Sequence, residues 1–295
     1  MPFGQELCFL GMDVELRHLK ALVVIAEEGT ITAAAARLRL TQPALSRTLA
    51  ALEGHLDVRL VDRSSRHLTL TPAGRTLREH GQAILAHVDA ALAETTAVSR
   101  PLRVGYTCAV LGELTVPLLR SWRRSHPHVT LELRRVDSRT AGLATGETDV
   151  AVLRTRPADA RLRAEALYLE ERVAALPDDH ALAARPALTL AELADESLVA
   201  CPEAGAASVE LWPRERRPES VRVVENVDAW LTTIAAGDAV GIAAAGTRES
   251  HQHPGVAYVP VTDAPAATVY VAHPAQPTHP QTTEFLAAVR EAVSG

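Results

Sequence analysis

The 295 residues are enough for more than one domain, and 47% hydrophobic with 22% charged residues is typical of a globular protein. A formal net charge of −6 excludes nucleic-acid binding through bulk positive charge, and 3% aromatic residues argue against stacking on single-stranded bases. Three scattered cysteines, and the lack of any run of about 18 apolar residues, predict a cytoplasmic protein with no disulfide framework and no membrane span.

The first eleven residues precede any periodic pattern, and we expect them to form a disordered extension or an upstream start ahead of Met12. Their sequence, MPFGQELCFLG, lacks the basic start and long apolar core of a signal peptide. Apolar residues at helical spacing then predict a helix from Val14 to Ala26, which Gly29 ends. A short alanine-rich helix follows and runs to Leu38.

The stretch LTQPALSRTLAALE, residues 40–53, predicts a third helix with two unlike faces. Thr41 can cap this helix, and Pro43 falls in its first turn, where no backbone donor is needed. One face is a stripe of four leucines, namely Leu45, Leu49, Leu52 and Leu56. The other face, near the helix start, holds Gln42, Pro43, Ser46, Arg47 and Ala50.

Three helices with a short turn between the second and third predict a helix-turn-helix, whose last helix enters the DNA major groove. Glutamine can contact adenine with two hydrogen bonds, arginine can contact guanine or phosphate, and serine can bond to either. A polar helix face taken alone is more often a solvated surface. The surrounding charge favours DNA here, because residues 37–75 hold seven arginines against three carboxylates, which leaves −10 for the rest of the chain.

The segment DVRLVDRSSRHLTLTPAG predicts a wing of two short strands around a polar tip. The alternating apolar residues are Val58, Leu60, Leu68 and Leu70. Such a wing would place Arg63 and Arg66 beside phosphates or in the minor groove, although Arg63 could instead pair with Asp62.

Thr71 and Pro72 begin a long helix, which we predict over residues 72–98. Its apolar stripe consists of Leu77, Ile84, Val88 and Leu92. A helix of this length cannot bury its stripe on so small a module, so we expect a partner helix from a second subunit. Two copies would present two recognition helices about one duplex turn apart.

Residues 13–75 resemble the N-terminal domain of the LysR-type transcriptional regulators. The matching residues are LRHLKALVVIAEEGTITAAAARLRLTQPALSRTLAALEGHLDVRLVDR and LTLTPAG. The resemblance implies major-groove contacts by Gln42, Pro43, Ser46 and Arg47, and a wing contact by Arg66. Two positions differ from the family pattern: Asp57 replaces the usual Gly and Val61 the usual Phe. Asp tolerates a left-handed backbone less well than Gly, so these differences concern stability more than DNA binding.

Beyond the short link SRPL, strand and helix patterns alternate, which predicts parallel α/β sheets. The first part has a strand at 102–106, a helix through Arg124, a strand over 129–133, a short helix ending at Gly146 and a buried strand at 149–153. The second part has strands at SLVAC, SVRVV and AVGIAAA, helices near 206–212 and over 228–236, the returning segments VAYVPV and ATVYVAH, and a final helix over 281–293.

Two lobes crossed twice by the chain form a bilobed binding domain, and LysR-type proteins have this architecture, which is similar to that of periplasmic binding proteins. We therefore expect an α+β protein with a winged helix-turn-helix, a long linker helix and a bilobed α/β effector domain. The predicted boundaries are 1–11 for the extension, 12–71 for the DNA-binding domain, 72–98 for the linker helix and 99–295 for the effector domain. Lobe I would cover about 102–158 and 263–295, and lobe II about 159–262.

Ligands of such domains bind at strand C-termini and helix N-termini in the cleft between the lobes. The positions selected are Thr107, Cys108, Ala109, residues 135–138 with Val136, Arg154, Cys201, Pro202, Val227 and Asp228. Thr107 could instead be only a helix cap. Ala109 stands where several relatives hold an effector carboxylate with Ser or Thr, although helix N–H groups could still bind an anion. Arg154 could bind an anionic effector, or pair with Asp149 or Glu165.

Other chemistry finds little support in the sequence. Cys108 and Cys201 invite a thiol-switch hypothesis like that of peroxide-sensing relatives, but two small buried residues is the simpler interpretation. HQH at 251–253, with His273 and His279, lacks the ligand spacing of a metal site and is typical of a solvated loop. There is no Gly-rich phosphate loop and no G-x-S-x-G elbow, so we expect no cofactor, no metal and no enzymatic activity.

The sequence thus predicts a LysR-type regulator, dimeric or tetrameric, that binds double-stranded operator DNA. A small-molecule effector would change the cleft angle and so the DNA-bound state, with RNA polymerase as a further partner of an activator. One other interpretation is a solute-binding module without a transcriptional role, which the helix-turn-helix disfavours. Another is an enzyme of the same bilobed fold, which no catalytic constellation supports.

Overall fold

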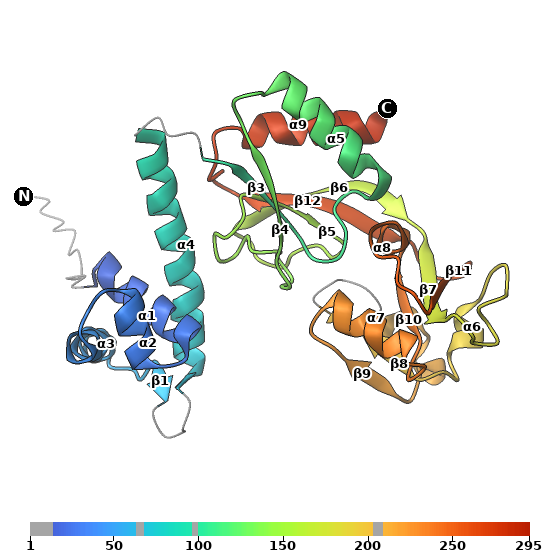
Figure 1. Ribbon diagram of the computed structural model, residues 1–295, viewed down its shortest axis with the longest axis horizontal. Helices are drawn as coiled ribbons and strands as arrows, with labels where there is room; N and C mark the ends of the chain where they lie inside the picture. Colours follow the sequence, from blue (N-terminus) through green and yellow to red (C-terminus); the bar gives the residue numbers. More distant parts are fainter. Residues whose placement is uncertain (1–13, 63–67, 96–99, 203–208) are drawn as a thin grey trace, which may run out of the picture. The chain divides into compact units, whose positions relative to one another are not determined.

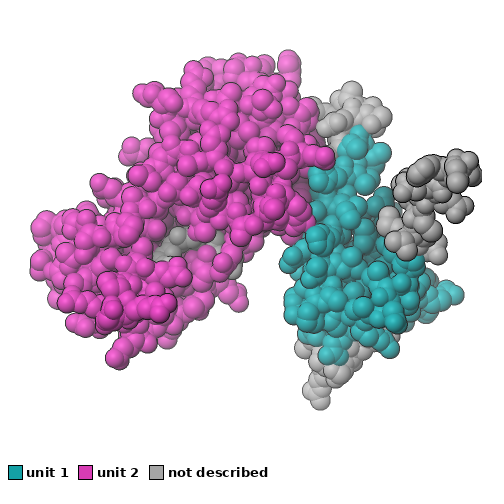
Figure 2. All heavy atoms as spheres, turned by 180° about the vertical axis from the view of Figure 1, so that it is seen from behind, with its two compact units in different colours: residues 1–92 teal, residues 93–295 magenta. Residues whose placement is uncertain are grey.

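The chain divides into two compact units, residues 1–92 and 93–295 (Figure 2). The computed structural model describes residues 14–62, 68–95, 100–202 and 209–295. The predicted extension, 1–11, therefore lies outside the described residues.

Three short helices build the core of the first unit, in the order predicted. They are α1 (Leu16–Glu28), α2 (Ile31–Arg37) and α3 (Gln42–Leu56). Gly29 ends α1 in the left-handed backbone conformation, and the side chains of Thr30 and Thr41 cap α2 and α3 by accepting N–H bonds from Ala33 and Ala44. Leu45, Leu49 and Leu52 are buried as expected, but Leu56 is 39% exposed, because the helix ends there and the stripe runs past the core.

The wing begins with two short antiparallel strands, β1 (Val61–Asp62) and β2 (Thr69–Leu70). The prediction placed Val58 and Leu60 in the first strand, but both precede it. The Glu53 side chain fixes this junction, since its Oε1 accepts the N–H groups of Leu60 at 2.8 Å and Val61 at 3.2 Å. The predicted tip, including Arg63 and Arg66, lies in 63–67, outside the described residues.

The long helix α4 (Pro72–Thr95) completes the first unit, which ends at Leu92 within the last turn of this helix. At Gly81 it comes so close to α1 that an added Cβ would lie 3.5 Å from Leu19 and 3.7 Å from Val23. Farther along, Ile84 and Leu92 are 43% and 58% exposed. The described residues of the first unit therefore leave these two side chains of the apolar stripe partly uncovered. The predicted end at Val98 falls outside the described residues.

A five-stranded sheet in the order β4-β3-β5-β12-β6 organises the first lobe of the second unit (Figure 1). Its strands are β3 (Leu102–Tyr106), β4 (Leu131–Arg135), β5 (Val150–Leu153), β6 (Leu162–Glu170) and β12 (Ala267–Pro274). β3 is parallel to β4 and β5, as predicted, and β12 is antiparallel to β5 and β6. The fully buried third strand is confirmed in β5.

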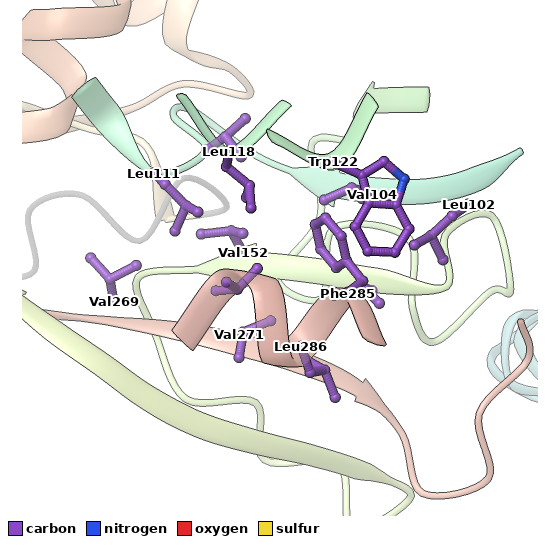
Figure 3. Packing of buried hydrophobic residues seen from close by; sticks show 13 residues of the cluster. Leu102, Val104, Leu111, Leu118, Trp122, Val152, Val269, Val271, Phe285 and Leu286 are labelled. Atoms are coloured by element: carbon purple, nitrogen blue, oxygen red, sulfur yellow. The ribbon is translucent and has the colours of Figure 1, made fainter. Parts of the chain in front are cut away.

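Helices α5 (Thr115–Ser125) and α9 (Thr282–Ser294) lie side by side against this sheet (Figure 1). Trp122 of α5 meets Phe285 of α9 edge to face, with ring centroids 5.4 Å apart, and both pack on strand valines (Figure 3).

The helix predicted to end at Gly146 is instead a run of turns. The positive φ angles of Ala141 (46°) and Gly142 (86°) interrupt helical geometry there.

A second sheet, β10-β7-β11, is antiparallel and organises the other lobe. Its strands are β7 (Arg172–Pro177), β10 (Gly241–Ala244) and β11 (Val256–Val261). The parallel pair β8 (Leu198–Ala200) and β9 (Val221–Val223) adjoins it through a bridge between Leu198 and Val240. The helices are α6 (Leu190–Leu193), α7 (Val227–Ala235) and α8 (Ala245–Ser250), with 3-10 turns η1 (Gly112–Leu114), η3 (Val209–Leu211) and η4 (Arg214–Arg216) elsewhere in the unit.

The two crossings between the lobes are short. β6 and β7 were not predicted, and only Glu171 separates them, so the chain leaves the first sheet at that residue. The expected start of lobe II at 159 is corrected accordingly, because β6 pairs with β12 in the first sheet. The predicted helix near 206–212 is described only in part, as η3 over its last residues.

Candidate functional site

The first turns of α3 present the polar face that the sequence predicts. Thr41, Gln42, Pro43 and Arg47 are exposed, and Ser46 is half-buried with its Oγ 3.3 Å from the Gln42 amide nitrogen. Leucines of the same helix are buried on the opposite side, which holds the polar face outward. The amide, hydroxyl and guanidinium thus lie together on a rigid element and can donate and accept hydrogen bonds.

The arginines of the first unit differ in whether their guanidinium groups form ion pairs with carboxylates. Within the described part of the chain Arg47 makes no ion pair, whereas Arg37 pairs with Glu27 at 2.7 Å and Glu28 at 2.9 Å. Arg59, at the base of the wing, lies 3.6 Å from Glu53 with its side chain largely exposed. An unpaired, exposed guanidinium at the start of a helix suits contact with a polyanion.

The segment after β3 places the first set of predicted cleft residues. Thr107, Cys108 and Ala109 are all buried. Thr107 caps no helix, because the next helical turn begins only at Gly112. The Cys108 carbonyl accepts a hydrogen bond from His251, and the Cys108 sulfur lies 3.9 Å from the Thr247 hydroxyl.

The two cysteines predicted to line the cleft belong to one apolar cluster. Cys108 and Cys201 are each 2% exposed, neither is in a disulfide, and both pack with Val173, Val227 and Trp230. Their environment is that of small core residues, in line with the simpler interpretation of these cysteines.

Arg154 is buried at the end of β5 and its guanidinium is fully engaged. Nε and Nη2 donate to the two carboxylate oxygens of Glu170 at 2.9 and 2.8 Å, and Nη1 donates to the Ala109 carbonyl at 2.7 Å. The carboxylate pairing considered from the sequence is therefore present, but with Glu170 and neither of the two acids expected. Burial beside this carboxylate raises the pKa of Tyr168 to about 12.

Asp149 and Glu165, the two acids expected as partners of Arg154, pair with other residues. Asp149 is buried and accepts hydrogen bonds from Arg100, Arg103 and Thr278. Burial alone would raise the pKa of its carboxyl, but these bonds hold it well below its usual range. Glu165, on the exposed part of β6, pairs with Arg290 at 2.7 Å.

A second set of predicted cleft residues lies where β4 and α7 approach each other. Arg135, at the end of β4, donates to Asp228 in the first turn of α7 at 2.6 Å and to Asp137 at 3.1 Å. Val136 is half-buried and bonds to the Tyr106 carbonyl, while Val227 is buried. A hollow of about 510 Å³ lies here, lined by Asp137, Pro202, Val223, Val224, Glu225 and Asn226. The sequence selects residues 135–138 as cleft positions, but the pairing of Arg135 with Asp228 was not predicted.

The described residues contain no group of three or more His, Cys, Asp or Glu side chains that could hold a metal ion. His251 is not the solvated loop residue expected from HQH, because it is half-buried against the Cys108 carbonyl. No helix in the described ranges is long and apolar enough to cross a membrane.

Two family models match the chain. The model for "Bacterial regulatory helix-turn-helix protein, lysR family" matches residues 16–75, and the model for "LysR substrate binding domain" matches residues 95–294. The matches divide the chain at nearly the same place as its two compact units do.

Individual proteins are similar over most of the chain. The HTH-type transcriptional regulator YnfL of Escherichia coli (strain K12) is 37% identical over 195 residues, which are 64% of this chain and 66% of that protein. TfdS of Cupriavidus pinatubonensis is 33% identical over 239 residues, 77% and 81% of the two chains. The crystal structure of CbnR, a LysR family transcriptional regulator, has a TM-score of 0.69 at 25% identity and covers 95% of this chain and 99% of its own. CbnR in complex with its target DNA gives a TM-score of 0.64.

Proposed function

The chain belongs to the LysR family of bacterial transcriptional regulators, and from that premise we propose which of its residues contact DNA and effector. It is a DNA-binding regulator with an effector-binding domain, and not an enzyme. The observation that carries the assignment is the exposed polar start of α3 above a buried leucine stripe.

On the DNA side, α3 enters the major groove of a double-stranded operator with its first turns. Thr41, Gln42, Pro43, Ser46 and Arg47 form the contact surface, and the wing residues Arg63 and Arg66 lie along the backbone or minor groove. The charge of Arg47, unpaired within the described residues, and the amide of Gln42 support base contact.

On the effector side, a small molecule occupies the cleft between the lobes of the second unit. Its walls are the segment Thr107–Ala109, Val136, Cys201 with Pro202, and the start of α7 at Val227 and Asp228. The hollow beside Asp137 and Pro202 supports this position. Effector binding would change the Arg135–Asp228 contact and so the cleft angle.

The protein acts as a dimer or tetramer in the cytoplasm, where its operator is found. The exposed side chains of Ile84 and Leu92 on α4 support self-association. RNA polymerase is a further partner if the protein activates transcription.

Fluorescence anisotropy with DNA from immediately upstream of the protein's own gene, against a scrambled duplex, tests the DNA assignment. We expect Arg47→Ala to lose about 1–3 kcal/mol of the preference for the upstream DNA. Arg17→Ala, which removes an exposed charge already paired with Glu15, serves as the matched control and should keep the preference. Equal, salt-sensitive binding of both duplexes by wild type and Arg47→Ala would contradict the assignment of Arg47.

A further inference from the structure

The ion pair at the end of β5 joins three separate parts of the second unit. Arg154 and Glu170 have side chains 2% and 7% exposed, and the carboxylate receives two parallel bonds from the guanidinium. The remaining donors of Arg154 face the carbonyls of Ala109 at 2.7 Å and Val110 at 3.4 Å. No donor of this guanidinium is left for a ligand.

The partners of Arg154 belong to two different parts of the second unit. Ala109 and Val110 continue the cleft-wall segment that follows β3, whereas Glu170 is the last residue of β6, directly before the chain crosses to the other lobe. The guanidinium therefore ties the cleft wall to the crossing point.

The start of α8 closes over this ion pair. A Cβ at Gly246 would lie 2.7 Å from Glu170 Oε1 and 2.8 Å from Arg154 Nη2, so only glycine fits without a shift. From the same helix Thr247 reaches the Cys108 sulfur, and Glu249 accepts the Glu113 N–H at 3.2 Å. An element of the second lobe thus rests on the pair and on the segment that the pair holds.

We propose that Arg154 is a positioning residue: with Glu170 it holds the cleft-wall segment 107–110 at the interlobe crossing, and it does not contact the effector. This rests on the proposed function of the cleft, to which it adds how the wall keeps its shape. A guanidinium and a carboxylate removed from water are stable only while each satisfies the other. Loss of one partner leaves a buried charge that draws water in, so the segment bonded to Arg154 is the first to loosen.

The reactivity of the two buried cysteines tests this locally. In the full chain carrying Cys8→Ser, we expect Arg154→Gln to raise the rate of Cys108 alkylation by iodoacetamide by about tenfold or more, since breaking a buried pair costs several kcal/mol. Cys201 is equally buried in the same cluster but is not in the segment bonded to Arg154, so its rate should stay near that of wild type. Peptide mass spectrometry separates the two sites.

Glu165→Gln is the matched control, because it removes an ion pair on the same strand whose side chains are exposed, and it should leave both rates unchanged. If Arg154→Gln does not fold, Glu170→Gln tests the same pair from the other side. Unchanged alkylation of Cys108, or equal acceleration of Cys108 and Cys201, would overturn the proposal, since the latter shows global unfolding. The assay uses neither DNA nor effector, so its failure is distinct from a failure of the DNA-binding assignment.

Discussion

At the scale of single residues, Asp57 holds a backbone conformation that suits glycine. It ends α3 with φ 51° and ψ 34°, in the left-handed region. Side chains with a Cβ are disfavoured there by about 1–2 kcal/mol, and Asp somewhat less than most. The Asp that replaces the family's usual Gly at this position therefore has a strained backbone.

We expect Asp57→Gly to raise the free energy of unfolding of the first unit by about 1 kcal/mol. Urea denaturation followed by circular dichroism at the helical band gives the value. Asp57→Ala removes the carboxylate but keeps the Cβ, so it should show no such gain. An equal gain in both variants would mean that charge, and not backbone conformation, is responsible.

Glu53 is a second residue whose single side chain stabilises the first unit, because it binds two backbone N–H groups. Its buried carboxylate accepts two backbone N–H groups where the chain turns from α3 into the wing. We expect Glu53→Ala to destabilise the first unit by about 2–4 kcal/mol, because two buried donors lose their acceptor. Glu79→Ala, at an exposed position of α4, should change the same urea midpoint little. A small effect of Glu53→Ala would show that water replaces the carboxylate.

At the scale of elements, α4 has more apolar surface than its own unit covers. Each aliphatic side chain buried between two such helices contributes about 1.5–3 kcal/mol to the free energy of their association. We therefore expect Ile84→Asp to raise the dissociation constant of the oligomer at least about tenfold, as measured by sedimentation equilibrium. Asp89→Asn changes charge outside the stripe and should leave association intact. An oligomer unaffected by Ile84→Asp would place the interface elsewhere.

At the scale of the whole molecule, Asp149 joins the beginning and the end of the second unit. It binds Arg100 and Arg103 near the start of the unit and Thr278 close to its last helix. Because its pKa is lowered in the folded state, it stabilises the fold at pH values above the unfolded pKa of about 3.9. This stabilisation is lost as the pH falls from there towards the folded pKa.

We expect Asp149→Asn to unfold more easily at pH 7 than wild type, and the difference to shrink as the pH is lowered from 5 to 3. All three tryptophans, Trp122, Trp212 and Trp230, lie buried in the second unit, so urea denaturation followed by their fluorescence reports on that unit. Arg290→Gln, which breaks an exposed pair, is the control. A constant difference across this pH range would show that the Asp149 carboxylate is not the titrating group.

The elements that sequence predicted well are those specified by neighbouring residues. The caps of α2 and α3, the glycine that ends α1 and the buried leucines of α3 all depend on residues within one or two helical turns. The strands β6 and β7 were missed, because their sequence carries charged residues and their pairing partners β10, β11 and β12 lie far along the chain.

The sequence by itself determined the two-part organisation, the helix-turn-helix and its exposed polar face, because helical periodicity and capping are local. Tertiary structure alone decided the partners of the buried and half-buried polar side chains. Arg154 meets Glu170 across 16 positions, Asp149 meets Thr278 across 129, and His251 meets Cys108 across 143. The sequence around a carboxylate or guanidinium does not indicate which distant residue will pair with it. Only the packing of strands and lobes brings that partner within hydrogen-bond distance.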